Sequence, residues 1–237
     1  FGGLVALAFV TGGSRGLGLA TARELNKRGF KLVLFARDQE LLKKVSEELQ
    51  ATYEVVNLED ITATREAFTL ALEKYGTPDI LMLAHGVMSE KMSKTLKTND
   101  SEWSRVLNIN LNSVFTIINI VGSKMADSRN GRIIVYSACM GRMSGPGNTG
   151  GFAPYRISKA GVNALVRNLA HETGLGNRGL LVDAICPNHS RTDMGGPDAP
   201  KSAEEGAETA VWLATREYLP GETKTGLLWE DHEIVEW

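Results

Sequence analysis

The stretch Thr11-Gly12-Gly13-Ser14-Arg15-Gly16-Leu17-Gly18 lies between an apolar run, residues 4–10, and a segment, residues 17–27, with apolar residues at helical spacing. Glycines at such a junction let the backbone turn tightly and approach a pyrophosphate. The helix that follows offers free N–H groups and a positive dipole end to the same anion. A ligand-free glycine turn is the alternative, but the order strand, loop, helix favours a nucleotide site. Its predicted contacts are Gly12, Ser14, Arg15, Gly16, Leu17 and Gly18.

Segments typical of strands and helices alternate along the whole chain. We predict strands at residues 4–10, 31–36, 53–58, 80–83, 132–136, 180–185 and 225–228. We predict helices at residues 17–27, 39–50, 64–75, 101–125, 155–173 and 202–215, the last with a capping-box pattern of Ser202 and Glu205. Helical crossovers imply a parallel sheet covered on both faces. The expected fold is therefore α/β: a single Rossmann-type, doubly wound domain over residues 1–237 with a seven-stranded parallel sheet.

Composition and charge narrow the possible classes of function. Hydrophobic residues make up 43% of the chain and charged residues 23%, as in ordinary globular proteins. The net charge is −2 with both signs interspersed, so we expect no nucleic-acid partner. The apolar runs are strand-length and the first residues lack a signal-peptide pattern, so we expect no membrane and a cytoplasmic location. Two cysteines, Cys139 and Cys186, exclude a disulfide scaffold, and we assign no metal ligands.

The residues that end the second predicted strand indicate which dinucleotide binds. Sites for NAD place an acid there to bond the ribose 2′-hydroxyl, and this chain has Ala36 followed by Arg37. Arg15 and Arg37 together suit a 2′-phosphate, which guanidinium groups bind bidentately, so we expect NADP(H). Two alternatives stay open: both arginines are solvated surface residues, or Asp38 reaches the ribose.

Tyr155 and Lys159 are four residues apart on a predicted helix and therefore share one of its faces. Reduction of a carbonyl needs a proton donor, but a free tyrosine, with a pKa of about 10, is a poor one at neutral pH. A nearby ammonium lowers that pKa. We therefore predict Tyr155 as general acid and Lys159 as its partner. Two long loops, residues 140–154 and 187–201, follow strands and would close the pocket.

In motif and order, these features resemble the short-chain dehydrogenase/reductase family over nearly the whole chain. The loop Thr11–Gly18 reads TGxxxGxG, and Tyr155–Lys159 reads YxxxK after the fifth strand. The tail, with residues 191–197, residues 204–214 and a final Ile234-x-x-Trp237, is similar to the carbonyl-reductase branch. The resemblance implies an oxidoreductase that reduces a small ketone or aldehyde with NADPH and assembles as a homodimer or homotetramer. Met140, Met143, Phe152 and Met194 suggest an apolar substrate.

The resemblance also assigns roles that spacing alone does not. Asn110 matches an asparagine that holds a water in a proton relay to the lysine, whereas Asn108 and Asn112 fall on other helix faces. Asp60 and Ile61 match a pair that contacts the adenine, and Thr192 helps to hold the nicotinamide end. Further residues expected beside the cofactor are Ala84, His85, Gly86 and Pro187.

The main departure from the family is the serine that orients the substrate carbonyl. The family's Ser-Ser-x-x-Gly reads Ser137-Ala138-Cys139-Met140-Gly141 here, with alanine at the active position. In an extended strand Ser137 points to the other side, although a bulge could turn it inward, and Ser144 is another hydroxyl that could substitute. We include Ser137 among the catalytic candidates.

Two further departures and the missing serine keep other functions open. The family's Asn-Asn-Ala-Gly reads Leu83-Ala84-His85-Gly86, which places a structural or catalytic histidine near the cofactor, and its Pro-Gly reads Pro187-Asn188. One alternative to a reductase is a relative that binds NADP(H) as a sensor or docks a partner without turnover. Another is an isomerase or cyclase that keeps the site and changes the reaction.

Overall fold

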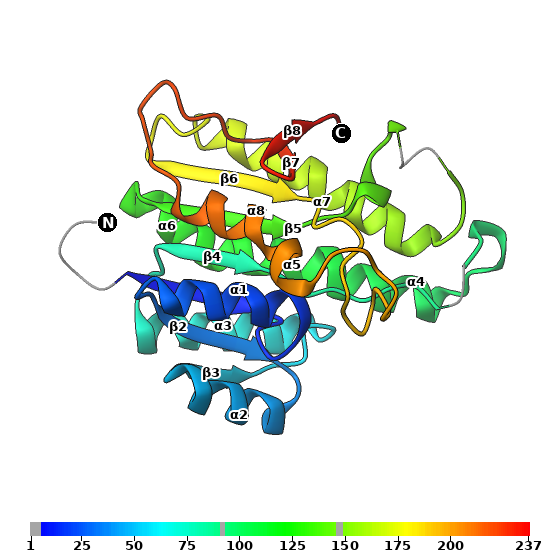
Figure 1. Cartoon of the computed structure of the whole chain (residues 1–237), viewed down its shortest axis with the longest axis horizontal. Helices are drawn as coiled ribbons and strands as arrows, with labels where there is room; N and C mark the ends of the chain where they lie inside the picture. The colour runs from blue at the N-terminus through cyan, green and yellow to red at the C-terminus, as the bar shows by residue number, and fades with distance from the viewer. Residues whose placement is uncertain (1–5, 91–92, 146–148) are drawn as a thin grey trace.

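A computed structural model describes residues 6–90, 93–145 and 149–237, and eight strands within these residues form one sheet in the order β3-β2-β1-β4-β5-β6-β7-β8 (Figure 1). Seven strands run parallel, and β8 pairs antiparallel with β7. The strands are β1 (Leu7–Thr11), β2 (Lys31–Ala36), β3 (Thr52–Val55), β4 (Ile80–Leu83), β5 (Gly131–Tyr136), β6 (Leu180–Ile185), β7 (Leu228–Glu230) and β8 (Glu233–Val235). The predicted α/β, doubly wound fold is confirmed.

The two ends of the sheet differ from the sequence prediction. The stretch predicted as the last strand, residues 225–228, becomes β7, which begins only at Leu228. The chain then turns back through Asp231 and His232 into β8. Both turn residues have positive φ, 50° and 66°, the backbone of a tight hairpin that usually carries Asn-Gly. At the other end β3 stops at Val55 because β2 ends at its register partner Ala36. The sheet therefore has one antiparallel strand that the sequence did not predict.

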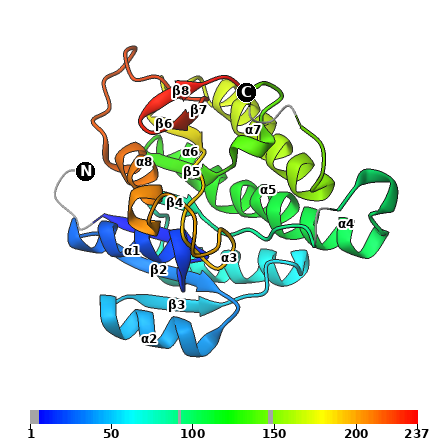
Figure 2. The ribbon, with the colours of Figure 1, turned by 45° about the vertical axis from the view of Figure 1, so that its right-hand side comes forward.

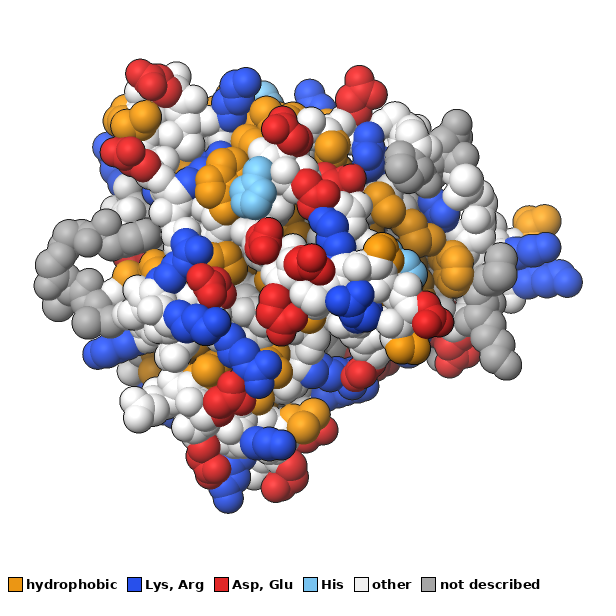
Figure 3. Space-filling view, in the orientation of Figure 1, with side chains coloured by type: hydrophobic (Ala, Val, Ile, Leu, Met, Phe, Trp, Pro, Cys, Tyr) orange, Lys and Arg blue, Asp and Glu red, His pale blue; other side chains and the backbone are white. Residues whose placement is uncertain are grey.

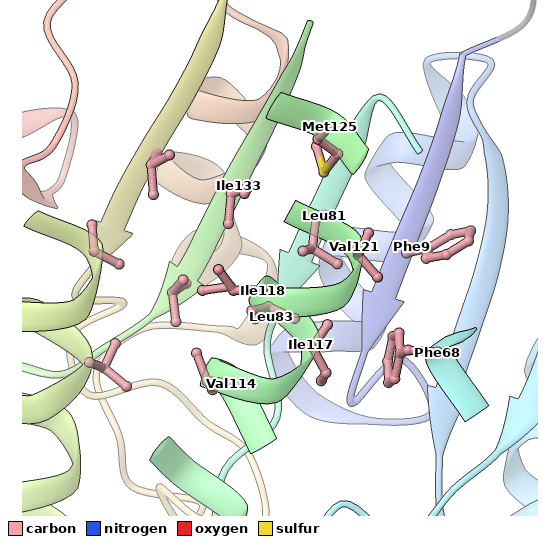
Figure 4. Packing of buried hydrophobic residues seen from close by; sticks show 14 of the residues in the cluster. Phe9, Phe68, Leu81, Leu83, Val114, Ile117, Ile118, Val121, Met125 and Ile133 are labelled. Carbon is pink, nitrogen blue, oxygen red and sulfur yellow. The ribbon is translucent and has the colours of Figure 1, made fainter. Parts of the chain in front are cut away.

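Helices cover both faces of the sheet (Figure 2). One face carries α1 (Gly16–Lys27), α2 (Gln39–Leu49) and α8 (Ala203–Thr215), and the predicted capping box opens α8. The other face carries α3 (Ile61–Tyr75), α7 (Ala153–Glu172) and the long helix, which comprises α4 (Asp100–Leu107), α5 (Ser113–Ile117), α6 (Ser123–Ser128) and two π-helical turns between them. Figure 4 shows Ile117, Val121 and Met125 of the long helix packed over Leu81 and Ile133 of the sheet.

The long helix, Asp100–Ser128, is long and apolar enough by length and composition to cross a membrane, although its sequence contains no membrane-length apolar run. Of its most apolar 18-residue window, 56% is buried inside the protein, as is usual for a helix that packs in a protein core. On the face shown in Figure 3, basic and acidic side chains are interspersed.

Candidate active site

A cleft of about 680 Å³ lies at the carboxyl ends of the parallel strands, where α/β sheets bind ligands. It is bordered by the glycine loop, the ends of β2 and β4, the turn after β5, the start of α7 and the loop after β6. The predicted residues that line it are Gly12, Ser14, Arg15, Gly16, Leu17, Gly18, Arg37, Ala84, His85, Gly86, Ser137, Tyr155, Lys159, Pro187 and Thr192. The fold thus gathers almost all of the predicted residues in one place.

The glycine loop is packed too closely for side chains. A Cβ added at Gly18 would lie 2.2 Å from the carbonyl oxygen of Gly12, and one at Gly12 would lie 3.1 Å from the carbonyl oxygen of Ala84. Gly12 and Gly16 also have positive φ, 65° and 55°. This loop delivers the chain into the N-terminus of α1 inside the cleft. A close backbone cradle at a helix N-terminus fits the pyrophosphate of a dinucleotide.

The region expected to hold the ribose contains two arginines and no acid at position 36. Ala36 and Arg37 line the cleft at the end of β2. Asp38 also borders it, but its Oδ1 accepts a hydrogen bond of 3.0 Å from the backbone N–H of Leu41 and caps α2. Arg15 forms an exposed ion pair of 3.0 Å with Asp193, which belongs to the loop after β6.

The predicted adenine contacts, Asp60 and Ile61, do not line the cleft. Asp60 instead caps α3, because its Oδ1 accepts a hydrogen bond of 2.9 Å from the backbone N–H of Ala63. Asn57 and Leu58 border the cleft in their place. This position has a physical cause: β3 ends at Val55, so the chain leaves the sheet and reaches the cleft earlier than the predicted strand allowed.

Tyr155 and Lys159 lie on the first turns of α7 and are buried, with 6% and 4% of their surface exposed. Lys159 Nζ donates a hydrogen bond of 2.6 Å to the Tyr136 carbonyl oxygen and lies 5.9 Å from the centre of the Tyr155 ring. Burial lowers the pKa of Lys159 to about 8 and raises the pKa of Tyr155. The expected lowering of the Tyr155 pKa is therefore not found, and its phenol is protonated at neutral pH, as a proton donor must be.

Asn110 lies in the first π-helical turn of the long helix, Asn108–Asn112. Its Oδ1 accepts from the Val87 N–H at 2.8 Å, and its Nδ2 donates to the Val87 carbonyl at 2.9 Å and to the Ser158 hydroxyl at 3.0 Å. These bonds fasten the loop after β4 to α7 beside Lys159, but Asn110 itself does not line the cleft. These contacts fit a positioning role for Asn110, and its part in a proton relay stays a prediction.

His85 occupies the place where the family carries an alanine. Its Nδ1 is 2.6 Å from the Thr11 hydroxyl and its Nε2 is 2.8 Å from the Ser113 hydroxyl, so it links β1 to the long helix. Burial and the nearby charge of Lys159 lower the pKa of His85 to about 3. A ring that stays neutral and has both nitrogens engaged favours the structural interpretation over the catalytic one.

Ser137 borders the cleft, but its hydroxyl is held by α7, which speaks against a substrate-orienting role. Its backbone N–H continues the pairing with β6, so there is no bulge, and its hydroxyl donates to Asn163 Oδ1 at 2.5 Å. Ala138 packs in a buried cluster with Tyr155 and therefore presents a methyl group beside the phenol. Ser144 does not substitute either, because it bonds to the Trp237 carbonyl and lies outside the cleft lining.

Several features of the cleft were not assigned from the sequence. Cys139 and Cys186 both line it, as do Val87 and Met88. Of the four residues expected in the apolar pocket, Met140, Phe152 and Met194 border the cleft, whereas Met143 is 83% exposed and does not. Asn188 has a φ of 58°, a left-handed backbone, at the position where the family carries glycine.

Comparisons with known proteins agree with this geometry. A family model described as short chain dehydrogenase matches residues 6–203. The chain is 33% identical over 189 residues to the 3-oxoacyl-[acyl-carrier-protein] reductase FabG of Rickettsia prowazekii, covering 79% of this chain and 73% of the relative. It is also 33% identical over 190 residues to the protein of that name from Escherichia coli, covering 79% and 75% of the two chains.

Solved structures show the same fold. A blue fluorescent protein from a metagenomic library, in complex with NADPH, superposes with a TM-score of 0.83 at 24% identity and covers 95% of this chain and 96% of its own. The match of the family model over most of the chain and the likeness to the two reductases settle the family. The chain belongs to the short-chain dehydrogenase/reductase family of NAD(P)-binding oxidoreductases.

Proposed function

We propose that the protein is a carbonyl reductase that uses NADPH to reduce a small, apolar ketone or aldehyde. The observation that carries this proposal is the buried Tyr155, which stays protonated at neutral pH and lines the same cleft as Lys159 and the glycine loop. Bound NADPH would supply the hydride. The remaining chemistry falls to the chain's own residues.

Tyr155 donates its phenolic proton to the oxygen of the substrate carbonyl as negative charge develops there, a contribution of about 10²–10⁴ in rate. Lys159 is held in place by the Tyr136 carbonyl and supplies a positive charge close to the phenol. The apolar side chains of Met140, Phe152 and Met194 border the cleft and would exclude water from an apolar substrate.

The preference for NADPH rests on the arginines. Arg37 lines the cleft where an NAD-specific site carries an acid, and Asp38 is engaged as the cap of α2. Arg15 would exchange its exposed pairing with Asp193 for a phosphate. Charge-assisted hydrogen bonds of this kind contribute about 1.5–3 kcal/mol.

Ala138 favours a second candidate, because a methyl group stands where a hydroxyl would hold the substrate oxygen. In that case the protein binds NADP(H) as a sensor, or catalyses an isomerisation or cyclisation without net reduction. The retained Tyr155 and Lys159 favour the reductase, since binding a dinucleotide alone does not require a proton donor in the cleft.

The two candidates are separated by NADPH oxidation in the presence of a substrate panel, with NADPH affinity measured alongside by fluorescence. The panel comprises apolar ketones, apolar aldehydes and a 3-oxoacyl thioester, because the relatives are named as reductases of that class. Oxidation of NADPH with any member supports the reductase. Tight NADPH binding without oxidation supports the sensor, and product formation without NADPH consumption supports the isomerase or cyclase. A homodimer or homotetramer in the cytoplasm is part of the proposal, and sedimentation measures the assembly.

A further inference from the structure

The two cysteines of the chain lie at the same end of neighbouring strands. Cys139 begins the short turn Cys139–Gly141 after β5, and Cys186 directly follows β6. The two strands pair in parallel with Tyr136 opposite Ile185, which brings the cysteines that follow them together. Cys186 is buried, and the half-buried Cys139 packs against the core cluster to which Cys186 belongs.

The two thiols are free and lie close enough for each to shift the pKa of the other. The Cys186 thiol beside it lowers the pKa of Cys139, with smaller help from the Met140 N–H and the Arg142 charge, while burial and Glu230 oppose the shift. The same contact raises the pKa of Cys186. Cys139 thus has a lowered pKa and a protonated thiol beside it, the arrangement of reactive cysteine pairs.

Both cysteines also border the catalytic cleft, and neither has a part in the proposed proton transfer. They lie near enough to Tyr155 that negative charge on either sulfur adds to the effect of burial in raising the pKa of its phenol. The turn that carries Cys139 has little freedom of its own. A Cβ on Gly141 would lie 2.7 Å from Lys159 Cβ, and the Gly141 carbonyl accepts a hydrogen bond of 3.2 Å from Asn163. A shift of this turn would therefore displace Lys159.

We propose that Cys139 and Cys186 are a reversible thiol pair in the active-site cleft, which a peroxide oxidises to an intramolecular disulfide that suppresses turnover. The loss of turnover rests on the proposed reductase function, whereas formation of the disulfide does not.

The oxidation proceeds in two steps. The Cys139 thiolate attacks one oxygen of a hydroperoxide, the O–O bond breaks, and the leaving alkoxide or hydroxide takes a proton from water, so that Cys139 becomes a sulfenic acid. The Cys186 thiol then attacks the Cys139 sulfur, the S–O bond breaks, and water leaves with the Cys186 proton. The peroxide gains two electrons and the two thiols lose them. A small dithiol reverses the process by thiol–disulfide exchange.

The test uses the full chain, reduced and then treated with hydrogen peroxide. Thiols are counted after denaturation, the intact mass is measured, and turnover is followed with an active member of the substrate panel. We expect the wild type to lose both thiols and about 2 Da, the two hydrogens of the thiols. It should run as an unlinked chain on a non-reducing gel. Its turnover should fall by about tenfold or more, since small displacements of catalytic groups are costly, and dithiothreitol should restore it.

Two matched variants separate the roles of the cysteines. Cys186→Ala should stop at a sulfenic acid on Cys139 that dimedone traps, and Cys139→Ala should keep its remaining thiol at the same peroxide dose. Retention of both thiols by the wild type, cross-linking only between chains, or a disulfide with unchanged turnover would each overturn the proposal. If the reduced wild type turns over nothing in the panel, the reductase function fails, while the thiol count and the mass still decide the disulfide.

Discussion

The substitution Ala138→Ser adds a hydroxyl to the wall of the cleft beside Tyr155, where the structure has a methyl group. Ala138 borders the cleft, so the added oxygen would stand at the cleft wall. A hydroxyl aimed at the developing oxyanion contributes about 1–3 kcal/mol to the transition state. We therefore expect kcat/KM to rise by about 5- to 150-fold, the factor that corresponds to this energy.

The neighbouring substitution, Ser137→Ala, is the matched control, and its effect should be on stability. Ser137 is 3% exposed, and its hydroxyl donates a hydrogen bond to Asn163 Oδ1. Its removal leaves a buried acceptor without a donor, which costs about 1–3 kcal/mol. For a chain of this length each kcal/mol lowers Tm by about 2–4 °C. We expect kcat/KM to stay within about twofold, because the hydroxyl does not face the substrate.

Both variants are assayed by steady-state NADPH oxidation and by thermal unfolding. A tenfold loss of kcat/KM in Ser137→Ala at an unchanged Tm would refute the assignment, since its hydroxyl would then act on the substrate. An Ala138→Ser variant that binds NADPH normally and gains no activity would refute it equally, since the oxyanion would then lie elsewhere.

Three further predictions concern the cofactor site and its supports. Arg37→Ala should weaken NADPH binding by about tenfold or more and leave NADH binding unchanged, as measured by fluorescence titration; equal losses for both cofactors would contradict the 2′-phosphate assignment. Gly18→Ala should abolish dinucleotide binding in calorimetry, because its Cβ would lie 2.2 Å from the Gly12 carbonyl oxygen, and wild-type affinity would refute the cradle. The folded pKa of His85, about 3, is below its unfolded value, so its contribution to stability is present above about pH 6.5 and falls by about 1.4 kcal/mol per pH unit below it. Denaturant unfolding of His85→Asn at pH 5 and pH 7 should show a smaller acid loss than the wild type, and an identical loss would disprove the assignment.

Local sequence patterns correctly predicted the features whose geometry depends only on neighbouring residues. The glycine loop and the Tyr155–Lys159 pair each belong to a single strand–loop or helix unit, so their spacing carries the geometry. The same holds for Asn188: asparagine at the family's glycine position predicts the left-handed backbone that it adopts.

Features that depend on distant partners were mispredicted or missed. The end of β3, and with it the cleft contact at Asn57, is set by the length of β2. The direction of the Ser137 hydroxyl is set by Asn163 on α7. The meeting of Cys139 and Cys186 depends on the register of β5 against β6. None of these partners is marked by a motif near the residue it controls.

The most direct test of the proposed function is the variant Tyr155→Phe, which removes the phenolic oxygen and keeps the ring in its buried place. We predict that NADPH binds with nearly wild-type affinity while kcat falls by about 10²–10⁴, the contribution of a general acid. A variant that binds NADPH and retains most of its turnover would contradict the account, because the proton would then come from a group other than Tyr155.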